Sequence, residues 1–262
     1  MGFFKKRMRI LALGGGSARG LCSIGVLKIL EKHFGRNKLP FDMVIGTSIG
    51  SLIGASYCLG MTVEELESRV KDFTWPKMVD FGIYSTGMIK GDKLEDIIKD
   101  CVDGKCFSDT NIPFALTTTN IETGEELIHD SGDLVKLLRA SCSWPGIFTA
   151  VEYDGKLLAD GGVRNSIPTK AAKAYGATSI LAVDPGFAVK NQKMTNVLRV
   201  TVQAVQIMGE ELNFYQSKQA DITIKPDLKD IDQFDFDKSA HIVKMGGAAA
   251  ENLIKQIKRK FS

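Results

Sequence analysis

The sequence has little of what metal sites and disulfide frameworks need. It contains only three histidines and five cysteines, and the cysteines lie far apart, form no C-x-x-C pair and follow no secretory leader pattern. Good zinc ligands are therefore too few at usable spacing, and we expect no metal. Disulfides are equally unexpected, which indicates a reducing compartment, the cytoplasm.

Net charge is also scarce. Lys and Arg together number 34 against 31 Asp and Glu, a formal net charge of +3, so bulk charge favours no nucleic-acid partner. The cations nevertheless gather near both ends of the sequence, over residues 5–9 and 255–260. Near an anionic bilayer each such cation contributes about 1 kcal/mol to binding at the membrane surface. The alternative is that these charges only keep the chain ends solvated. Peripheral contact with the inner face of a membrane therefore stays open.

A typical membrane span is missing as well. Residues 43–63 carry no charge, but they are rich in Gly, Ser and Thr and lack the flanking pattern of a span. With 44% hydrophobic residues among 262, the chain is able to bury a sizeable core, and no repeat or Pro-rich linker divides it. We expect a basic extension over residues 1–8 and a single domain over residues 9–262.

Apolar runs alternate with stretches of helical spacing along the chain. Strands are predicted over residues 9–13, 41–45, 112–119, 125–129, 156–159, 179–183 and 222–224. Helices are predicted over residues 21–30, 52–59, 62–73, 92–102, 133–141, 196–215 and 239–258. This rhythm predicts an α/β fold, with a mostly parallel central sheet that carries helices on both faces.

Two local patterns add detail to this outline. Thr62 and Asp92, each followed three residues later by Glu, have the spacing of capping boxes that begin helices. Between these helices, residues 74–90 form a long connection that contains Trp75, Phe81 and Tyr84. The connection is either a mobile lid or a loop that its aromatic side chains anchor to the core.

A candidate nucleophile lies in residues 46–50 (GTSIG), directly after the apolar run at 41–45. A serine hydroxyl attacks a substrate only when it is exposed, correctly oriented and next to a base that accepts its proton. Small residues two positions before and after Ser48 allow a strand to turn sharply into a helix and leave the hydroxyl at the tip. The alternative is that Ser48 is only a small residue in a well-packed helix start.

Residues 14–20 (GGGSARG) end the first predicted strand. A dinucleotide fingerprint would need Gly where Arg19 stands, and a phosphate-binding P-loop would need Lys and Ser or Thr where Leu21 and Cys22 stand. Consecutive glycines instead favour an oxyanion hole, because their amides converge without side-chain obstruction. Arg19 either adds positive charge near this loop or pairs with a local carboxylate.

The base that would activate Ser48 is the open question. His129 and His241 follow Ser48, as a triad of this type requires, but neither has an unusual sequence context, and His33 precedes it. Asp160 is the stronger candidate, because it ends an apolar strand and precedes two glycines that permit a tight turn. A carboxylate is a weak base toward serine, yet close contact and exclusion of water make direct transfer feasible.

Residues 14–20, 46–50 and 160–162 (DGG), in this order, resemble the three hallmark motifs of the patatin-like phospholipases. The resemblance covers the chain from about residue 9 to 257, and the compact length is similar to that of the bacterial stand-alone members. It implies a three-layer α/β fold and hydrolysis of acyl esters of lipids. It also implies a Ser-Asp dyad in place of a triad, with no metal or organic cofactor.

The resemblance also assigns roles to single residues. Ser48 takes the role of nucleophile and Asp160 that of base, and the oxyanion role falls to Gly14, Gly15, Gly16 and Arg19. Residues 141–148 (SCSWPGIF) resemble the family's segment upstream of the aspartate, which would line the site, although ordinary packing also accounts for its aromatics.

Two functions from different classes follow. The first is a serine acyl-ester hydrolase of the phospholipase A or lysophospholipase type, which forms an acyl-enzyme with a phospholipid or lysophospholipid substrate. The second is a catalytically weak regulatory or membrane-binding protein on the same scaffold, which would use the basic ends and the aromatic loop. Because every catalytic residue type is present, the sequence favours the enzyme.

Overall fold

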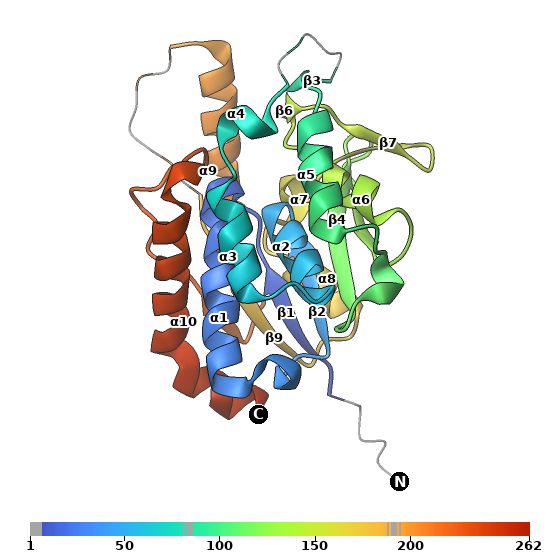
Figure 1. Ribbon diagram of the computed structural model, residues 1–262. Coiled ribbons are helices and arrows are strands. Elements are labelled where there is room, and N and C mark those ends of the chain that lie inside the picture. Colours follow the sequence, from blue (N-terminus) through green and yellow to red (C-terminus); the bar gives the residue numbers. More distant parts are fainter. Residues whose placement is uncertain (1–6, 81, 83–85, 188, 190–192, 194) are drawn as a thin grey trace.

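The central sheet of the molecule is seen in a computed structural model that describes residues 7–80, 82, 86–187, 189, 193 and 195–262 (Figure 1). Its strands are β1 (Arg9–Leu13), β2 (Met43–Thr47), β4 (Phe114–Asn120), β5 (Glu126–His129), β7 (Val151–Tyr153), β8 (Lys156–Asp160), β9 (Ser179–Val183) and β10 (Ile222–Ile224). They follow the order β10-β9-β1-β2-β4-β8-β7, and β5 pairs with β4. The pairings from β10 to β4 are parallel, whereas β5, β7 and β8 add antiparallel pairings.

Helices surround this sheet (Figure 1). They are α1 (Cys22–Phe34), α2 (Ile49–Cys58), α3 (Val63–Lys71), α4 (Trp75–Met78), α5 (Asp92–Val102), α6 (Leu134–Ser141), α7 (Gly162–Asn165), α8 (Thr169–Ala174), α9 (Val197–Ser217) and α10 (Ser239–Phe261). A short 3-10 helix, η1 (Ser17–Leu21), precedes α1, and two short strands, β3 (Gly87–Ile89) and β6 (Gly146–Phe148), pair separately.

Alternating side chains of the strands divide the core between the two faces of the sheet. Leu11 and Leu13 of β1 belong to a large cluster that includes residues of α1, α2 and α10. Ile10 and Ala12 point to the other face, where they join a smaller cluster that includes residues of α8. Burial on both faces explains why β1 reads as a continuous apolar run. The predicted three-layer α/β architecture is confirmed.

The predicted strands are confirmed with shifts of one or two residues, one of which matters for function. β2 extends to Thr47 rather than ending at residue 45, so the strand reaches the residue before Ser48. The sequence did not predict β3, β6, β7, α7 or α8, because segments of three to six residues are too short to show a period.

One of the two predicted capping boxes forms. The Thr62 side chain accepts a hydrogen bond from the Glu65 amide, and Glu65 accepts one from the Thr62 amide. The prediction for Asp92 was wrong, because the residue before α5 is Gly91 in a left-handed conformation. The carboxylate of Asp80 accepts the amides of Gly91 and Asp92 instead, so a residue from the preceding loop satisfies the start of α5.

The long connection after α3 is anchored through its described aromatic residue. The indole ring of Trp75 contacts the rings of Phe148, Phe234 and Phe236, with centroid distances of 6.3, 5.0 and 6.2 Å. Phe81 and Tyr84 lie outside the described residues, as do residues 1–6 of the predicted basic extension. The division of the chain at residue 8 stays a prediction. Within the described ranges, no helix is both long enough and apolar enough to span a bilayer.

Candidate active site

The sheet itself brings Ser48 and Asp160 together. β2 runs parallel to β4 and ends with Thr47 opposite Thr117. β8 runs antiparallel to β4 and ends with Asp160 opposite Thr118, the next residue of β4. β5 occupies the other edge of β4 over residues 116–119. β2 and β8 therefore lie on the same edge, and their carboxyl ends meet head to head.

Ser48 stands at a sharp turn between β2 and α2. Its backbone has φ 54° and ψ −130°, a conformation that costs a non-glycine residue about 1–3 kcal/mol. The flanking glycines make the turn possible, because a methyl group on Gly46 would overlap Ser51, and one on Gly50 would overlap the carbonyl oxygen of Leu13. Their lack of side chains lets the first turn of α2 lie directly against the strands. The predicted strand-turn-helix geometry is confirmed.

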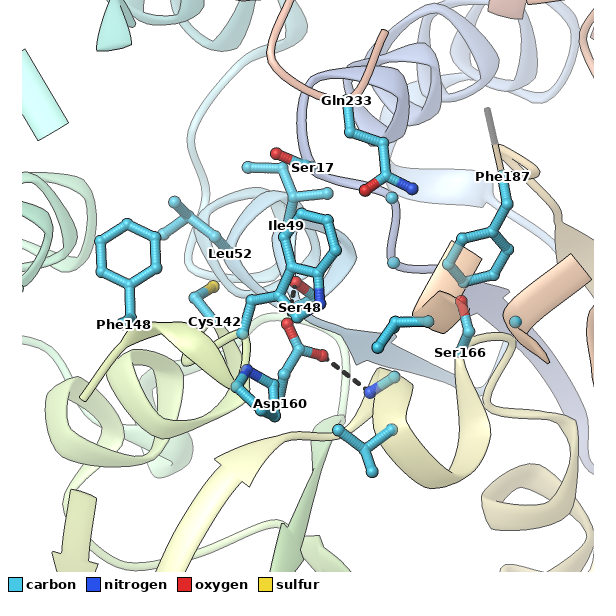
Figure 2. Close-up of a pocket in the computed structure, with 18 of the residues that line it drawn as sticks. Ser17, Ser48, Ile49, Leu52, Cys142, Phe148, Asp160, Ser166, Phe187 and Gln233 are labelled. Atoms are coloured by element: carbon cyan, nitrogen blue, oxygen red, sulfur yellow. Dashed lines mark hydrogen bonds between the residues drawn. The ribbon is translucent and has the colours of Figure 1, made fainter. Parts of the chain in front are cut away.

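The hydroxyl of Ser48 donates a hydrogen bond to the carboxylate of Asp160, with 2.6 Å between Oγ and Oδ2 (Figure 2). The other carboxylate oxygen, Oδ1, accepts the amide of Gly162 at 2.7 Å. Burial raises the pKa of Asp160 to about 6, although both hydrogen bonds oppose the shift. A carboxylate with this pKa is ionised at neutral pH and is a stronger base than an ordinary aspartate.

Hydrogen bonds from neighbouring elements hold both residues in place. The Ser48 amide donates to Oγ of Ser141, at the end of α6, over 2.9 Å, and this hydroxyl donates to the Thr117 carbonyl, also at 2.9 Å. On the other side, the Asp160 amide donates to the Ser143 carbonyl. The predicted proximity of residues 141–148 to the site is confirmed, but the contribution of Ser141 was missed. Only its place in the SCSWPGIF segment signalled it.

In the glycine loop, residues 14–20, the amides of Gly14, Gly15 and Gly16 do not all converge on one point, as an oxyanion hole built from the three glycines would require. The amide of Gly14 donates to the Val183 carbonyl at 3.0 Å, and that of Gly15 donates to the Ser166 carbonyl at 2.9 Å. Among the described residues, the amides of Gly16 and Ser17 have no acceptor, and both residues are only half-buried. Gly15 instead provides space, because a Cβ there would lie 3.1 Å from Cβ of Ser48.

Arg19 is buried, and its guanidinium group binds backbone carbonyls of two loops and neither Ser48 nor Asp160. Nη1 donates to the carbonyls of Leu228 and Ile231 at 2.5 and 2.8 Å. Nε donates to the carbonyls of Pro185 and Gly186 at 3.1 and 3.2 Å. The side chain therefore binds two distant loops to the glycine loop.

No histidine contacts the Ser-Asp pair in the described part of the chain. Nε2 of His129 lies 2.8 Å from Oγ1 of Thr118, and burial lowers the pKa of its imidazole. His33 pairs with Glu251, and His241 is exposed on α10. Within the same described ranges, no three His, Cys, Asp or Glu side chains are grouped so as to hold a metal ion.

The pair lies in a cavity of about 310 Å³ whose walls are largely apolar (Figure 2). Apolar side chains come from several elements, among them Leu52, Trp75, Trp144, Phe148, Met208 and Leu212. The polar side chains of the lining are those of Ser17, Ser48, Asp160, Ser166 and Gln233. Cys142 also lines the cavity, but burial raises the pKa of its thiol, so Ser48 is the better placed nucleophile.

The fold and this pair define an α/β protein in which a serine hydroxyl donates a hydrogen bond directly to a buried carboxylate. The sequence model of the patatin-like phospholipase family matches residues 11–173, which contain all three motifs. The chain belongs to the patatin-like phospholipase family.

Two similar proteins are much longer than this chain. Lysophospholipase NTE1 of Debaryomyces hansenii is 28% identical over 276 residues, which cover 93% of this chain and 18% of that protein. Patatin-like phospholipase domain-containing protein 6 of Homo sapiens is 34% identical over 186 residues, covering 67% of this chain and 13% of that protein. The chain thus spans less than a fifth of the length of these relatives.

Solved structures share the fold at low sequence identity. VipD from Legionella pneumophila has a TM-score of 0.64 at 10% identity, covering 95% of this chain and 67% of that chain. The type III effector protein ExoU has a TM-score of 0.53 at 13% identity, covering 95% of this chain and 53% of that chain. At these identities the likeness concerns the fold alone.

Proposed function

We propose that the protein is a serine acyl-ester hydrolase acting on lipids of the phospholipid or lysophospholipid class. The observation that carries this proposal is the 2.6 Å contact between Ser48 Oγ and Asp160 Oδ2 at an apolar cavity. Apolar walls suit an acyl chain, and the name lysophospholipase among the relatives supports a lipid ester as substrate.

In the first half of the reaction, Oγ of Ser48 attacks the acyl carbonyl carbon while Asp160 accepts the hydroxyl proton. The tetrahedral intermediate then collapses, the bond to the alcohol oxygen breaks, and the leaving alcohol takes the proton from Asp160. In the second half, Asp160 takes a proton from water, which attacks the acyl-enzyme. The fatty acid leaves, and the proton returns to Oγ of Ser48.

The negative charge that develops on the carbonyl oxygen of the substrate is stabilised by hydrogen-bond donors that have no other acceptor. The open amides of Gly16 and Ser17 serve this role in the proposal, and one well-placed donor is worth roughly 3 kcal/mol of barrier. Gly14 and Gly15 hold the loop against β9 and the Ser166 carbonyl, and Arg19 fixes it to the loops at residues 185–186 and 228–231. These three residues then act by positioning the loop.

A fluorophosphonate probe tests the nucleophile directly. Purified wild-type protein should be labelled and should hydrolyse p-nitrophenyl esters and lysophosphatidylcholine, whereas Ser48→Ala should do neither. Ser56→Ala is the matched control, because Ser56 is buried on the same helix, donates to the Leu52 carbonyl and does not line the cavity. Full labelling of Ser48→Ala would disprove the assignment.

The same proposal includes contact with a lipid surface through α9. Its buried face contains polar residues, among them Gln206, Asn213 and Gln216, which are at most 8% exposed. Its outward face exposes Val197, Val200, Ile207, Met208, Leu212, Phe214 and Tyr215, with the charged Glu211 among them. An apolar outward face on a helix is the reverse of the usual arrangement in water, and it fits insertion between lipid head groups.

The position of α9 supports this contact. Met208 and Leu212 belong both to the exposed face and to the cavity lining, and the exposed side chains of Ile121 and Val163 also line the cavity. An apolar rim of this kind lets a lipid pass from an aggregate to Ser48 without crossing water. The basic end of α10 lies at the opposite end of the molecule from the start of α9 (Figure 1).

A further inference from the structure

Gln233 has a buried polar group whose role the proposed mechanism leaves open. The residue is 2% exposed, and its Nε2 has no hydrogen-bond partner among the described residues. The same side chain lines the cavity that contains Ser48 and Asp160. Figure 2 shows its carboxamide pointing into this cavity, which Ser17 and Ile49 also line.

Hydrogen bonds hold the backbone at Gln233 and in the preceding turn, so this residue has a defined place beside the glycine loop. The Gln233 carbonyl accepts the amide of Ala18 at 3.1 Å, which ties the residue to η1 directly after the glycine loop. The preceding turn is held by Arg19, which donates to the Leu228 and Ile231 carbonyls. Arg19 therefore orders the glycine loop and the Gln233 segment together.

Burying an amide donor without an acceptor is unfavourable, and such groups are rare in folded proteins. Where one lies in a cavity, a bound molecule is the natural acceptor. A lipid ester offers this cavity only oxygen acceptors in its polar part, and the amide group of Gln is able to donate two hydrogen bonds. Gln233 lies outside the residues that the family sequence model matches, so no family motif accounts for it.

We propose that Nε2 of Gln233 donates a hydrogen bond to the carbonyl oxygen of the bound acyl ester and strengthens it as that oxygen becomes negative. This inference rests on the proposed function. No bond of Gln233 breaks, and its protons stay on nitrogen. The side chain supplements the open amides of Gly16 and Ser17, which is needed because the amides of Gly14 and Gly15 are already engaged.

The substitution Gln233→Met tests this role, because it keeps the length of the side chain and removes the donor. With p-nitrophenyl butyrate, which has no lipid head group, kcat should fall about 10- to 100-fold while KM changes less than threefold. The rate of labelling by the fluorophosphonate should fall by a similar factor. The melting temperature should stay the same or rise, since a buried unpaired amide has been removed.

Gln206→Met is the matched control. Gln206 is also 2% exposed and also has a buried polar atom without a partner, but it does not line the cavity. Its substitution should leave kcat and the labelling rate unchanged. A loss of kcat in both variants, or a lowered melting temperature in Gln233→Met, would indicate a structural role and overturn the inference.

The outcomes also separate this inference from the proposed function. If Gln233→Met keeps the wild-type kcat while Ser48→Ala is inactive, the donor role is wrong and the hydrolase proposal stands. If Gln233→Met loses activity only with phospholipid, through KM, the amide contacts the head group and the assignment to the ester carbonyl is wrong. If Ser48→Ala remains fully active, the hydrolase proposal fails and the role of Gln233 fails with it.

Discussion

Ser48 and Asp160 are 112 positions apart in the chain, yet their side chains are joined by a hydrogen bond. They meet because the residue before Ser48 and Asp160 itself pair with consecutive threonines of β4, Thr117 and Thr118, from strands of opposite direction. A hydroxyl and a carboxylate mounted on one sheet edge are held without any loop motion. Such preorganisation suits a base that is intrinsically weak toward serine.

Asp160→Asn should separate activity from stability. The raised pKa means that the folded state binds the Asp160 proton more tightly than the unfolded chain does. The ionised carboxylate therefore destabilises the fold at neutral pH, by about 3 kcal/mol for a pKa raised from 3.8 to about 6. Asparagine removes this charge, so we expect hydrolysis to fall at least 100-fold while the free energy of unfolding rises by roughly 1–3 kcal/mol at pH 7.5.

Urea unfolding at two pH values checks the electrostatic cause. At pH 4 the native Asp160 is largely protonated, so the gain in stability of Asp160→Asn should shrink there. Asp154→Asn is the control, because Asp154 is exposed in the turn between β7 and β8. Its effect on stability should be the same at both pH values. A gain of equal size at both pH values would argue against ionisation of Asp160 as the cause.

The pH dependence of hydrolysis should follow the ionisation of Asp160. Because Asp160 must be unprotonated to accept the proton of Ser48, kcat/KM should rise with pH through about 6 and then level off. The pKa of the His129 imidazole is also shifted, and this ring contacts Thr118, the residue paired with Asp160, so His129→Gln is the control. The His129→Gln variant should keep both the value of kcat/KM and the midpoint of its pH dependence. If kcat/KM of this variant no longer depended on pH, His129 rather than Asp160 would be the base.

The site was predictable where a short motif has strict local geometry. Gly46 and Gly50 border Ser48 because the turn admits no side chain there, and the strand before and helix after it were both visible in the sequence. Asp160 was found from its place at the end of an apolar strand and before two glycines, together with the order of the three motifs. Local rules thus located both members of the pair.

The rest of the site depends on contacts between distant segments, which no periodicity encodes. Ser141 reaches Ser48 from the end of α6, and residues 228–233 reach Ala18 and Arg19 from a distant loop. The outward apolar face of α9 was hidden for another reason. A helical period shows that one face is apolar, but it does not show whether that face meets a core or the surroundings.

Neighbouring glycines in α10 should respond in opposite ways to alanine. A methyl group on Gly246 would overlap the backbone of Cys22 at the contact between α1 and α10, whereas one on Gly247 would make ordinary contacts, the nearest at 3.4 Å. Gly246→Ala should therefore lower the free energy of unfolding by about 2 kcal/mol or more. Gly247→Ala should raise it by up to about 1 kcal/mol through helix propensity. Equal effects in urea unfolding would contradict this packing.

Arg19→Lys should impair both folding and hydrolysis. Lysine places a single ammonium group where the guanidinium now reaches four carbonyls in two loops, so several buried acceptors lose their donors. We expect a loss of roughly 2–4 kcal/mol in unfolding free energy and at least a tenfold loss in kcat. Arg199→Lys, on the exposed side of α9, should change neither. Retention of kcat in Arg19→Lys would instead indicate that positive charge alone matters.

Replacing two exposed apolar residues of α9 should weaken binding to lipid without harming the catalytic pair. Ile207 and Phe214 are 53% and 52% exposed and do not line the cavity. In the double variant Ile207→Ser, Phe214→Ser, sedimentation with phosphatidylcholine vesicles should fall about tenfold or more, since each side chain gains roughly 1 kcal/mol or more when it enters the apolar region. Hydrolysis of lysophosphatidylcholine in vesicles should fall with it, while the rate on p-nitrophenyl butyrate should stay unchanged.

Glu210→Ser is the control for this experiment, because Glu210 is exposed on the same helix and its substitution removes no apolar surface. Its binding to vesicles of a zwitterionic lipid should match that of the wild type. Sedimentation velocity gives the competing result. If the wild type is a dimer that the double variant dissolves, and vesicle binding is the same in both proteins, then the outward face of α9 meets a second copy of the chain and not a lipid surface.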